Sequence, residues 1–388
     1  MYKVKTYNKI SKDGLDILRN ENIDVSSSTE NAEAIILRSQ DLHSEEFPES
    51  LLAIGRAGAG VNNIPVDKCT EKGIVVFNTP GANANAVKEL VLAGLFLSAR
   101  DIIGGINYSK TLIGEGENVD ALVEKNKSHF KGFEIQGKRL AVVGLGAIGV
   151  MVANAGVALG MDVEGHDPFI SVDRAWGLSQ SVKKASNVNK MLSEADFVTV
   201  HMPLTDGTRN FMNKDRLSKL KKGATILNFA RPEIINSGDL LDAIGLGYVG
   251  KYISDFPTEE MLKNEKVICI PHLGASTQEA EDNCALMIAQ QILDFLKAGN
   301  ITNSVNFPNC EMERTGDFRL AIINDNVPNM VGQISKVLAD RGLNISEMIN
   351  KSKNNLAYTL VDINGEYNSE LENSLKNIPG IRRVRVIK

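Results

Sequence analysis

Short apolar runs separated by glycine or polar residues recur between Val4 and about Pro80. The clearest runs are residues 34–37, 51–55 and 74–77. Runs of this length between amphipathic stretches are typical of buried strands in a parallel sheet. A long helix follows over residues 86–100, where Val87, Leu90, Val91 and Leu95 have helical spacing. The pattern therefore predicts a small α/β unit at the start of the chain.

A second alternation of strands and helices begins near Lys138. Residues 139–143 form a buried-type strand, and further candidate strands occupy residues 162–165, 196–200, 225–229 and 267–270. The stretches between them are long enough for crossover helices, so the pattern indicates a doubly wound parallel sheet. Another long helix is predicted over residues 277–297, because Gly299 is an ordinary helix stop after a periodic run.

The last part of the chain has a different order of elements. Residues 303–316 are rich in Asn, Ser, Pro and Gly, which is typical of a linker. Strands are predicted at 318–323, 356–363 and 383–387, with a helical face at 330–338 and a short helix at 371–375. The order of these elements predicts a βαββαβ unit.

Composition narrows the class of protein. A chain of 388 residues that is 43% hydrophobic and 23% charged can form two or three domains with separate cores. The net charge of -5, without a run of basic residues, argues against a nucleic-acid partner. Neither a signal peptide nor a membrane-spanning apolar stretch is evident, so we expect a cytoplasmic protein and no membrane partner. The four cysteines (Cys69, Cys269, Cys284 and Cys310) fit no metal-ligand spacing, and no metal is expected.

A glycine-rich turn supplies the strongest candidate for a cofactor site. The sequence from Gly144 to Gly149 has the form GxGxxG, directly after the predicted strand 139–143 and before an apolar helical stretch. Gly144 permits the tight turn, Gly146 lets the backbone approach a pyrophosphate, and Gly149 allows close packing of helix and strand. Asp167, at the end of the next strand, can accept hydrogen bonds from a ribose and repels a 2′-phosphate. The pattern predicts that the chain binds NAD.

Three residues near predicted strand ends are candidates for catalysis. His272 follows the run 267–270, Arg231 follows the run 225–229, and Glu259 lies in a nearby loop. Oxidation of a 2-hydroxyacid needs a base for the hydroxyl proton and a cation for the carboxylate, besides a hydride acceptor. Spacing alone leaves open the alternative that all three are ordinary surface residues.

The sequence resembles the D-2-hydroxyacid dehydrogenases over residues 1–303. Among the members of that family, it resembles those that act on phosphoglycerate. The segments that carry the resemblance are GRAGAGVNNI (55–64), FNTP (77–80), GLGAIG (144–149), HMPLT (201–205), NFAR (228–231), FPTE (256–259) and PHLGASTQEA (271–280). The resemblance implies an NAD domain of doubly wound type, inserted in a flavodoxin-like substrate domain.

The resemblance also implies roles for individual residues. His272 would take the hydroxyl proton, Glu259 would orient it and stabilise the imidazolium, and Arg231 would bind the substrate carboxylate. The implied substrate ligands are Arg38 and Arg56 for the phosphate and the turn of Ala59, Gly60 and Val61 for the carboxylate. Besides the glycines and Asp167, the implied cofactor contacts are Ala147, Ile148, His201, Pro203, Thr205, Ala230, Asp255 and Gly274.

One cofactor contact is left open by the sequence. Members of the family commonly have an aspartate near the nicotinamide at the position of Ser254, and here the aspartate is Asp255, one place later. In an extended segment only one of the two side chains can point at the cofactor.

The last seventy or so residues resemble an ACT domain, which in serine-regulated relatives binds L-serine between paired domains. The resemblance implies that Asn324, Asn326 and Asn344 contact the effector, and that the chain forms a homodimer or homotetramer. The alternative is a domain that only mediates assembly. The implied domains are residues 1–98 (substrate, first segment), 99–275 (NAD), 276–303 (return helix), 304–316 (linker) and 317–388 (ACT).

The function implied by the resemblance is oxidation of D-3-phosphoglycerate to 3-phosphohydroxypyruvate with NAD, the first step of L-serine biosynthesis. One alternative keeps the chemistry but uses an unphosphorylated acid such as glycerate or glyoxylate. Another alternative is a nucleotide-sensing co-repressor on the same fold, for which the chain lacks the expected basic extensions.

Overall fold

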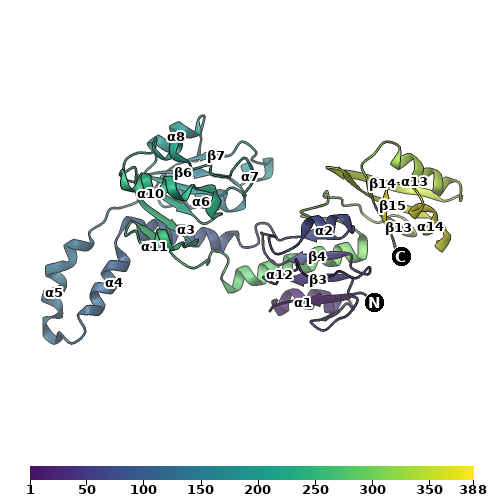
Figure 1. Ribbon diagram of the computed structural model, residues 1–388, viewed down its shortest axis with the longest axis horizontal. Coiled ribbons are helices and arrows are strands. Elements are labelled where there is room, and N and C mark those ends of the chain that lie inside the picture. Colours follow the sequence, from purple (N-terminus) through teal and green to yellow (C-terminus); the bar gives the residue numbers. More distant parts are fainter. The chain divides into compact units, whose positions relative to one another are not determined.

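The computed structural model describes residues 1–388 and divides into two compact units (Figure 1). The first unit consists of Met1–Asn83 and Gln278–Lys388, and the second of Ala84–Thr277. The predicted boundary at residues 98 and 99 falls inside helix α3 (Ala84–Ala99), which belongs to the second unit. The boundaries of the functional domains stay a prediction.

The first unit opens with a five-stranded sheet in which every strand pair is parallel. Its order is β2-β1-β3-β4-β5, the flavodoxin-like order that was predicted. The strands are β1 (Lys3–Thr6), β2 (Asp24–Ser26), β3 (Ala34–Leu37), β4 (Ala53–Arg56) and β5 (Val75–Phe77). The helices are α1 (Lys12–Asn20), α2 (Val66–Glu71) and α12 (Gln278–Ala298). All of β3 is buried, because helices cover both faces of the sheet.

Helix α12 returns the chain to this sheet and packs against α1. A Cβ at Gly14 of α1 would lie 2.4 Å from the backbone carbonyl of Ala285, so only glycine permits this close crossing. The helix confirms the prediction of a long helix over residues 277–297.

The C-terminal part of the first unit is a four-stranded antiparallel sheet with the predicted βαββαβ order. Its elements are β13 (Phe318–Asp325), α13 (Met330–Ala339), β14 (Asn344–Lys353), β15 (Leu356–Asn364), α14 (Ser369–Lys376) and β16 (Ile381–Ile387). Leu320 and Ile322 pack under the two helices. Ala321 and Ile323 point to the other face and join the core of the parallel sheet.

The antiparallel and parallel sheets of the first unit thus share one core. Arg319 and Asp362 have fully buried side chains and form an ion pair at 2.6 Å. Arg319 Nη1 also donates to the carbonyls of Ala298 and Met312, both at 2.9 Å. Within the segment predicted as a linker, Phe307, Cys310 and Met312 are buried, so this segment is part of the packing.

The second unit contains a seven-stranded parallel sheet of order β12-β11-β10-β9-β6-β7-β8. The strands are β6 (Arg139–Val143), β7 (Asp162–His166), β8 (Lys183–Lys184), β9 (Phe197–Val200), β10 (Ala224–Asn228), β11 (Val249–Ser254) and β12 (Val267–Cys269). The helices beside the sheet are α3, α6 (Ala147–Ala158), α7 (Val172–Trp176), α8 (Val188–Glu194), α9 (Lys214–Leu217), α10 (Ser237–Gly245) and α11 (Glu259–Leu262). The order reverses between β6 and β9, which confirms the doubly wound fold and defines its ligand-binding end.

A helical hairpin of α4 (Ile102–Thr111) and α5 (Val119–Asn126) projects from the second unit (Figure 1). The sequence pattern did not predict it. Ile102, Ile103, Ile106 and Ile113 of this hairpin are exposed. No helix in the chain has the length and apolarity needed to cross a membrane.

Candidate active site

The glycine turn of the second unit connects β6 to α6 at the point where the strand order reverses. Gly144 has φ of 92°, and a Cβ there would lie 2.8 Å from the carbonyl of His201. A Cβ at Gly149 would lie 1.9 Å from the Gly144 oxygen, so both positions require glycine. A Cβ at Gly146 would have no neighbour within 4 Å, and no side chain caps the N-terminus of α6. The turn therefore leaves helix N–H groups open to a pyrophosphate.

Asp167 follows β7 and holds the glycine turn in place. Its Oδ2 accepts from the Leu145 N–H and its Oδ1 from the Phe169 N–H, both at 2.8 Å. The half-buried carboxylate retains further lone pairs that can accept from ribose hydroxyls. Asp167 thus has the position that the dinucleotide pattern requires.

His201, at the end of β9, is not suited to act as a base. Its Nε2 is 2.9 Å from the Thr199 Oγ1, and its buried Nδ1 has no partner. Burial lowers the pKa of His201 to about 3, so the ring is neutral at physiological pH. Farther along this loop, the Thr208 hydroxyl donates to the Pro203 carbonyl at 2.6 Å and accepts from the Thr205 N–H at 2.8 Å.

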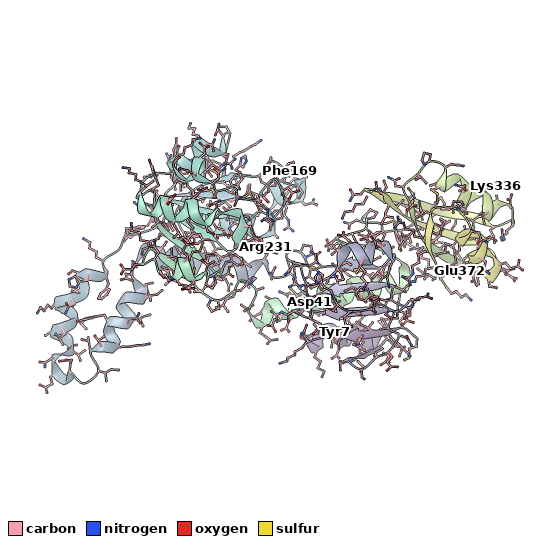
Figure 2. All side chains as sticks on the ribbon, in the orientation of Figure 1. Tyr7, Asp41, Phe169, Arg231, Lys336 and Glu372 are labelled. Carbon is pink, nitrogen blue, oxygen red and sulfur yellow. The ribbon has the colours of Figure 1, made fainter.

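Arg231 lies in the loop after β10, on the second unit (Figure 2). The buried Asn228 side chain donates to the Arg231 carbonyl at 2.9 Å and accepts from the Ala230 N–H at 3.1 Å. Arg231 Nη1 donates to the Ala230 carbonyl at 2.6 Å. The buried Asn228 therefore fixes the backbone that carries the half-buried guanidinium.

His272 follows β12 and is exposed, with its ring edge against Phe256 at a centroid distance of 5.1 Å. The same loop is tied down at Gly274, whose N–H donates to Asp255 Oδ2 at 3.0 Å. Asp255 is 1% exposed, and its Oδ1 is buried without a partner. Burial raises the pKa of Asp255, while the Gly274 N–H and a protonated His272 act in the opposite direction.

The structure separates the roles of Ser254 and Asp255. The buried Ser254 hydroxyl donates to the Asn228 carbonyl at 2.9 Å and accepts from the Phe256 N–H at 3.2 Å. The Ser254 hydroxyl therefore makes its hydrogen bonds to the backbone. Asp255, in contrast, has one carboxylate oxygen, Oδ1, without a hydrogen-bond partner. Of the two side chains, Asp255 is the one able to accept a new hydrogen bond.

Glu259 does not contact His272 in this structure. It begins α11, its side chain is 86% exposed, and its Oε1 accepts from Lys263 Nζ at 2.7 Å. Asp255 contacts the loop that carries His272 at Gly274, while the Glu259 side chain lies on the surface.

The candidate phosphate ligands of the first unit lie at adjacent strand ends. Leu37 of β3 pairs in register with Arg56 of β4, and Arg38 follows directly. Arg56 Nε donates to the Arg38 carbonyl at 3.0 Å, and Arg56 Nη1 donates to the Gly60 carbonyl. The Arg38 guanidinium forms an ion pair with Glu281 of α12. The neighbouring turn of Ala59, Gly60 and Val61 is held by Asn78, which donates to the Ala59 carbonyl at 2.6 Å.

Two of the three candidate effector contacts line a cavity of about 150 Å³ in the C-terminal sheet. Asn324 and Asn326 are in this lining, and exposed Asn344 is not. Asn350 lines the same cavity and donates to the Thr359 hydroxyl at 2.7 Å. Sequence reasoning missed Asn350, because no turn or glycine marks a residue in mid-strand.

Comparison with known proteins defines the family. Residues 105–274 match the model described as D-isomer specific 2-hydroxyacid dehydrogenase, NAD binding domain. The D-3-phosphoglycerate dehydrogenase of Haemophilus influenzae is 30% identical and aligns with 88% of this chain and 82% of its own length. The chain belongs to the D-isomer specific 2-hydroxyacid dehydrogenase family. Its second unit contains the NAD-binding domain of that family, and its cofactor is NAD.

Other members of the family differ from this chain in length. The D-3-phosphoglycerate dehydrogenase of Methanocaldococcus jannaschii is 35% identical over 78% of this chain, which spans only 56% of that relative. Among solved structures, the NAD+-bound 3-phosphoglycerate dehydrogenase of Entamoeba histolytica is 25% identical with a TM-score of 0.60. That alignment covers 79% of this chain and 98% of the other.

Proposed function

We propose that the protein oxidises D-3-phosphoglycerate to 3-phosphohydroxypyruvate with NAD, the first step of L-serine biosynthesis. The proposal is carried by Arg38 and Arg56, which lie at adjacent strand ends of a chain whose relatives are named D-3-phosphoglycerate dehydrogenases. Guanidinium groups are suited to phosphate, because their fork of N–H donors matches its oxygens.

The chemistry is assigned to residues of the second unit. NAD, when bound, supplies the acceptor for the hydride that leaves C2 of the substrate. His272 takes the hydroxyl proton, and Arg231 binds the carboxylate and polarises the oxygen of the developing carbonyl. The N–H groups of the turn 59–61 would also donate to the carboxylate. Glu259 can orient His272 only if it exchanges Lys263 for the imidazole.

For the cofactor, we assign the pyrophosphate to the turn 144–149, including the N–H groups of Ala147 and Ile148, and the ribose to Asp167. The remaining contacts are assigned to the loops that follow the strands, at His201, Pro203, Thr205, Ala230 and Gly274. Asp255, with its open Oδ1, is assigned to the nicotinamide end.

One observation favours a second candidate substrate. Arg38 is already neutralised by Glu281, so the first unit offers less positive charge than a phosphate site would have. An unphosphorylated acid such as glycerate or glyoxylate would not need that charge.

The test is the initial rate of NADH formation, measured over a range of concentrations of D-3-phosphoglycerate, D-glycerate and D-lactate. The proposal predicts that kcat/KM is highest for the phosphorylated acid, by about tenfold or more, because a charge-assisted pair contributes on the order of 1.5–3 kcal/mol. A preference for glycerate would support the second candidate. No turnover of any hydroxyacid, with NADH still bound, would favour a nucleotide-sensing role.

Regulation and assembly complete the proposal. We assign L-serine to the C-terminal sheet at Asn324, Asn326 and Asn344, with two or four identical chains in the cytoplasm. The asparagine side chains in the lining of this cavity, Asn324 and Asn326, support a small polar ligand there. Calorimetry with L-serine checks this assignment. If serine neither releases heat nor inhibits at millimolar concentration, the C-terminal region serves assembly or another ligand.

A further inference from the structure

Strand β1 of the first unit ends beside the candidate phosphate ligands. It pairs in parallel with β3, so the residues that follow the two strands lie side by side. Asn8 comes shortly after β1, and Arg38 comes directly after β3. The Asn8 Oδ1 accepts from the N–H groups of Arg38 at 3.3 Å, Ser39 at 3.0 Å and Gln40 at 2.9 Å. One side-chain oxygen therefore binds three consecutive backbone N–H groups, in the manner of an anion in a backbone nest.

The carbonyl side of the same segment is also bound by side chains. Arg56 Nε donates to the Arg38 carbonyl at 3.0 Å. Asn63 Nδ2 donates to that carbonyl at 3.2 Å and to the Gln40 carbonyl at 2.6 Å. Both polar groups of the Arg38 backbone thus bind side chains from other segments. The direction in which the guanidinium leaves the chain is set by these contacts, because Arg38 lies beyond the end of β3.

The backbone of Asn8 allows its side chain to be tested separately. Asn8 is exposed and has φ of 62°, in the left-handed region that asparagine and glycine adopt most readily. Glycine can therefore replace it without strain. Asn22 is also exposed and has φ of 59°, but it lies in the turn between α1 and β2, at the opposite edge of the parallel sheet. It is a matched control for the loss of an asparagine side chain in this conformation.

We infer that Asn8 is a positioning residue for Arg38, which holds the segment 38–40 so that the guanidinium can meet the substrate phosphate. The inference rests on the proposed function, in which Arg38 binds that phosphate. A guanidinium contact depends on the direction of its N–H groups. Arg38 must also exchange Glu281 for the phosphate, and a segment that is fixed beforehand loses less entropy in doing so.

The first test is steady-state kinetics of Asn8→Gly, which removes the acceptor and keeps the backbone conformation. We expect KM for D-3-phosphoglycerate to rise by about three- to tenfold, the effect of one ordinary hydrogen bond. The value of kcat, and KM for D-glycerate, should change by less than about twofold, because Arg38 meets only the phosphate. Asn22→Gly should leave KM for both acids unchanged.

A double-mutant cycle tests whether Asn8 acts through Arg38. In an Arg38→Ala background the phosphate contact is already lost, so Asn8→Gly should cause no further rise in KM for D-3-phosphoglycerate. A rise of the same size in both backgrounds would show that Asn8 acts independently of Arg38.

Hydrogen exchange gives a readout that needs neither substrate nor turnover. Amides of the peptide that contains residues 38–40 should exchange about tenfold faster in Asn8→Gly, because three N–H groups lose their acceptor. Asn8→Asp keeps the oxygen and tolerates the same backbone conformation, so it should restore the protection.

The inference is overturned if Asn8→Gly leaves KM for D-3-phosphoglycerate in place, raises KM for both acids equally, or does not speed exchange of the segment 38–40. Failure of the proposed function is a different result, seen in the wild type alone as the lack of any preference for the phosphorylated acid. The exchange measurement would still decide in that case whether Asn8 holds the segment.

Discussion

In the NAD-binding unit, the side chains around the cofactor site keep open positions, whereas the candidate phosphate ligands of the first unit already have partners within the chain. His201 Nδ1 and Asp255 Oδ1 are buried without a partner. Arg38, in contrast, is paired with Glu281, and Arg56 donates to backbone carbonyls. A ligand of the second unit therefore adds contacts to a preformed site. A phosphate at the first unit must exchange partners, which makes its recognition weaker and more dependent on salt.

The two units also differ in how their sheets are packed. The site loops of the second unit follow directly from the strands of one sheet. The first unit instead joins two sheets through one core, which contains Ala321 and Ile323 of β13 beside Phe77 of β5. Changes in this shared core should therefore affect the stability of the first unit, whereas changes in the strand-end loops of the second unit should affect chemistry.

The largest expected effect is on turnover. His272→Ala removes the proton acceptor, so kcat should fall by about two to four orders of magnitude. NADH binding, measured by fluorescence, should persist because the glycine turn is untouched. Turnover within tenfold of wild type would show that another group takes the proton.

Next in size is the loss of the buried ion pair of the first unit. Arg319→Ala leaves Asp362 buried without its partner and should destabilise this unit by about 3–5 kcal/mol. Urea unfolding measures the change. The double variant Arg319→Met with Asp362→Leu, which leaves no unpaired charge, should recover much of the loss. A destabilisation below about 1 kcal/mol, the size typical of a surface pair, would argue against a shared core.

The smallest effect concerns Glu281. Removing its charge in Glu281→Gln frees Arg38, so KM for D-3-phosphoglycerate should fall by about two- to fivefold, the range expected for a partly exposed pair. KM for D-glycerate should not change. Glu279→Gln, on the same turn of α12 and exposed, is the control. An unchanged KM for the phosphorylated acid would remove Arg38 from the phosphate site.

Local patterns were sufficient to predict much of the fold and of the cofactor site. The strand 139–143 and the turn 144–149 are adjacent in the sequence, so the local pattern of residues was enough to predict how they are arranged. The strand β11 was missed because Gly250 and Lys251 interrupt its apolar run. The hairpin of α4 and α5 was missed because its isoleucines form no buried face.

The features of the candidate site that could not be predicted depend on contacts between residues far apart in the sequence. Ser254 is unavailable because its hydroxyl binds the Asn228 carbonyl, and Glu259 faces solvent because of where α11 begins. Neither fact can be read from spacing. The shared core of the first unit did leave a signal, because the continuous apolar run from Leu320 to Ile323 indicates a strand buried on both faces.

We propose that the chain recognises a phosphorylated hydroxyacid through its first unit. The most direct measurement is the ratio of kcat/KM for D-3-phosphoglycerate to that for D-glycerate, in the wild type and in Arg56→Ala. We expect the ratio to fall by about tenfold or more in the variant, mainly through KM for the phosphorylated acid, because a charge-assisted contact is lost. Equal losses on both substrates would contradict it.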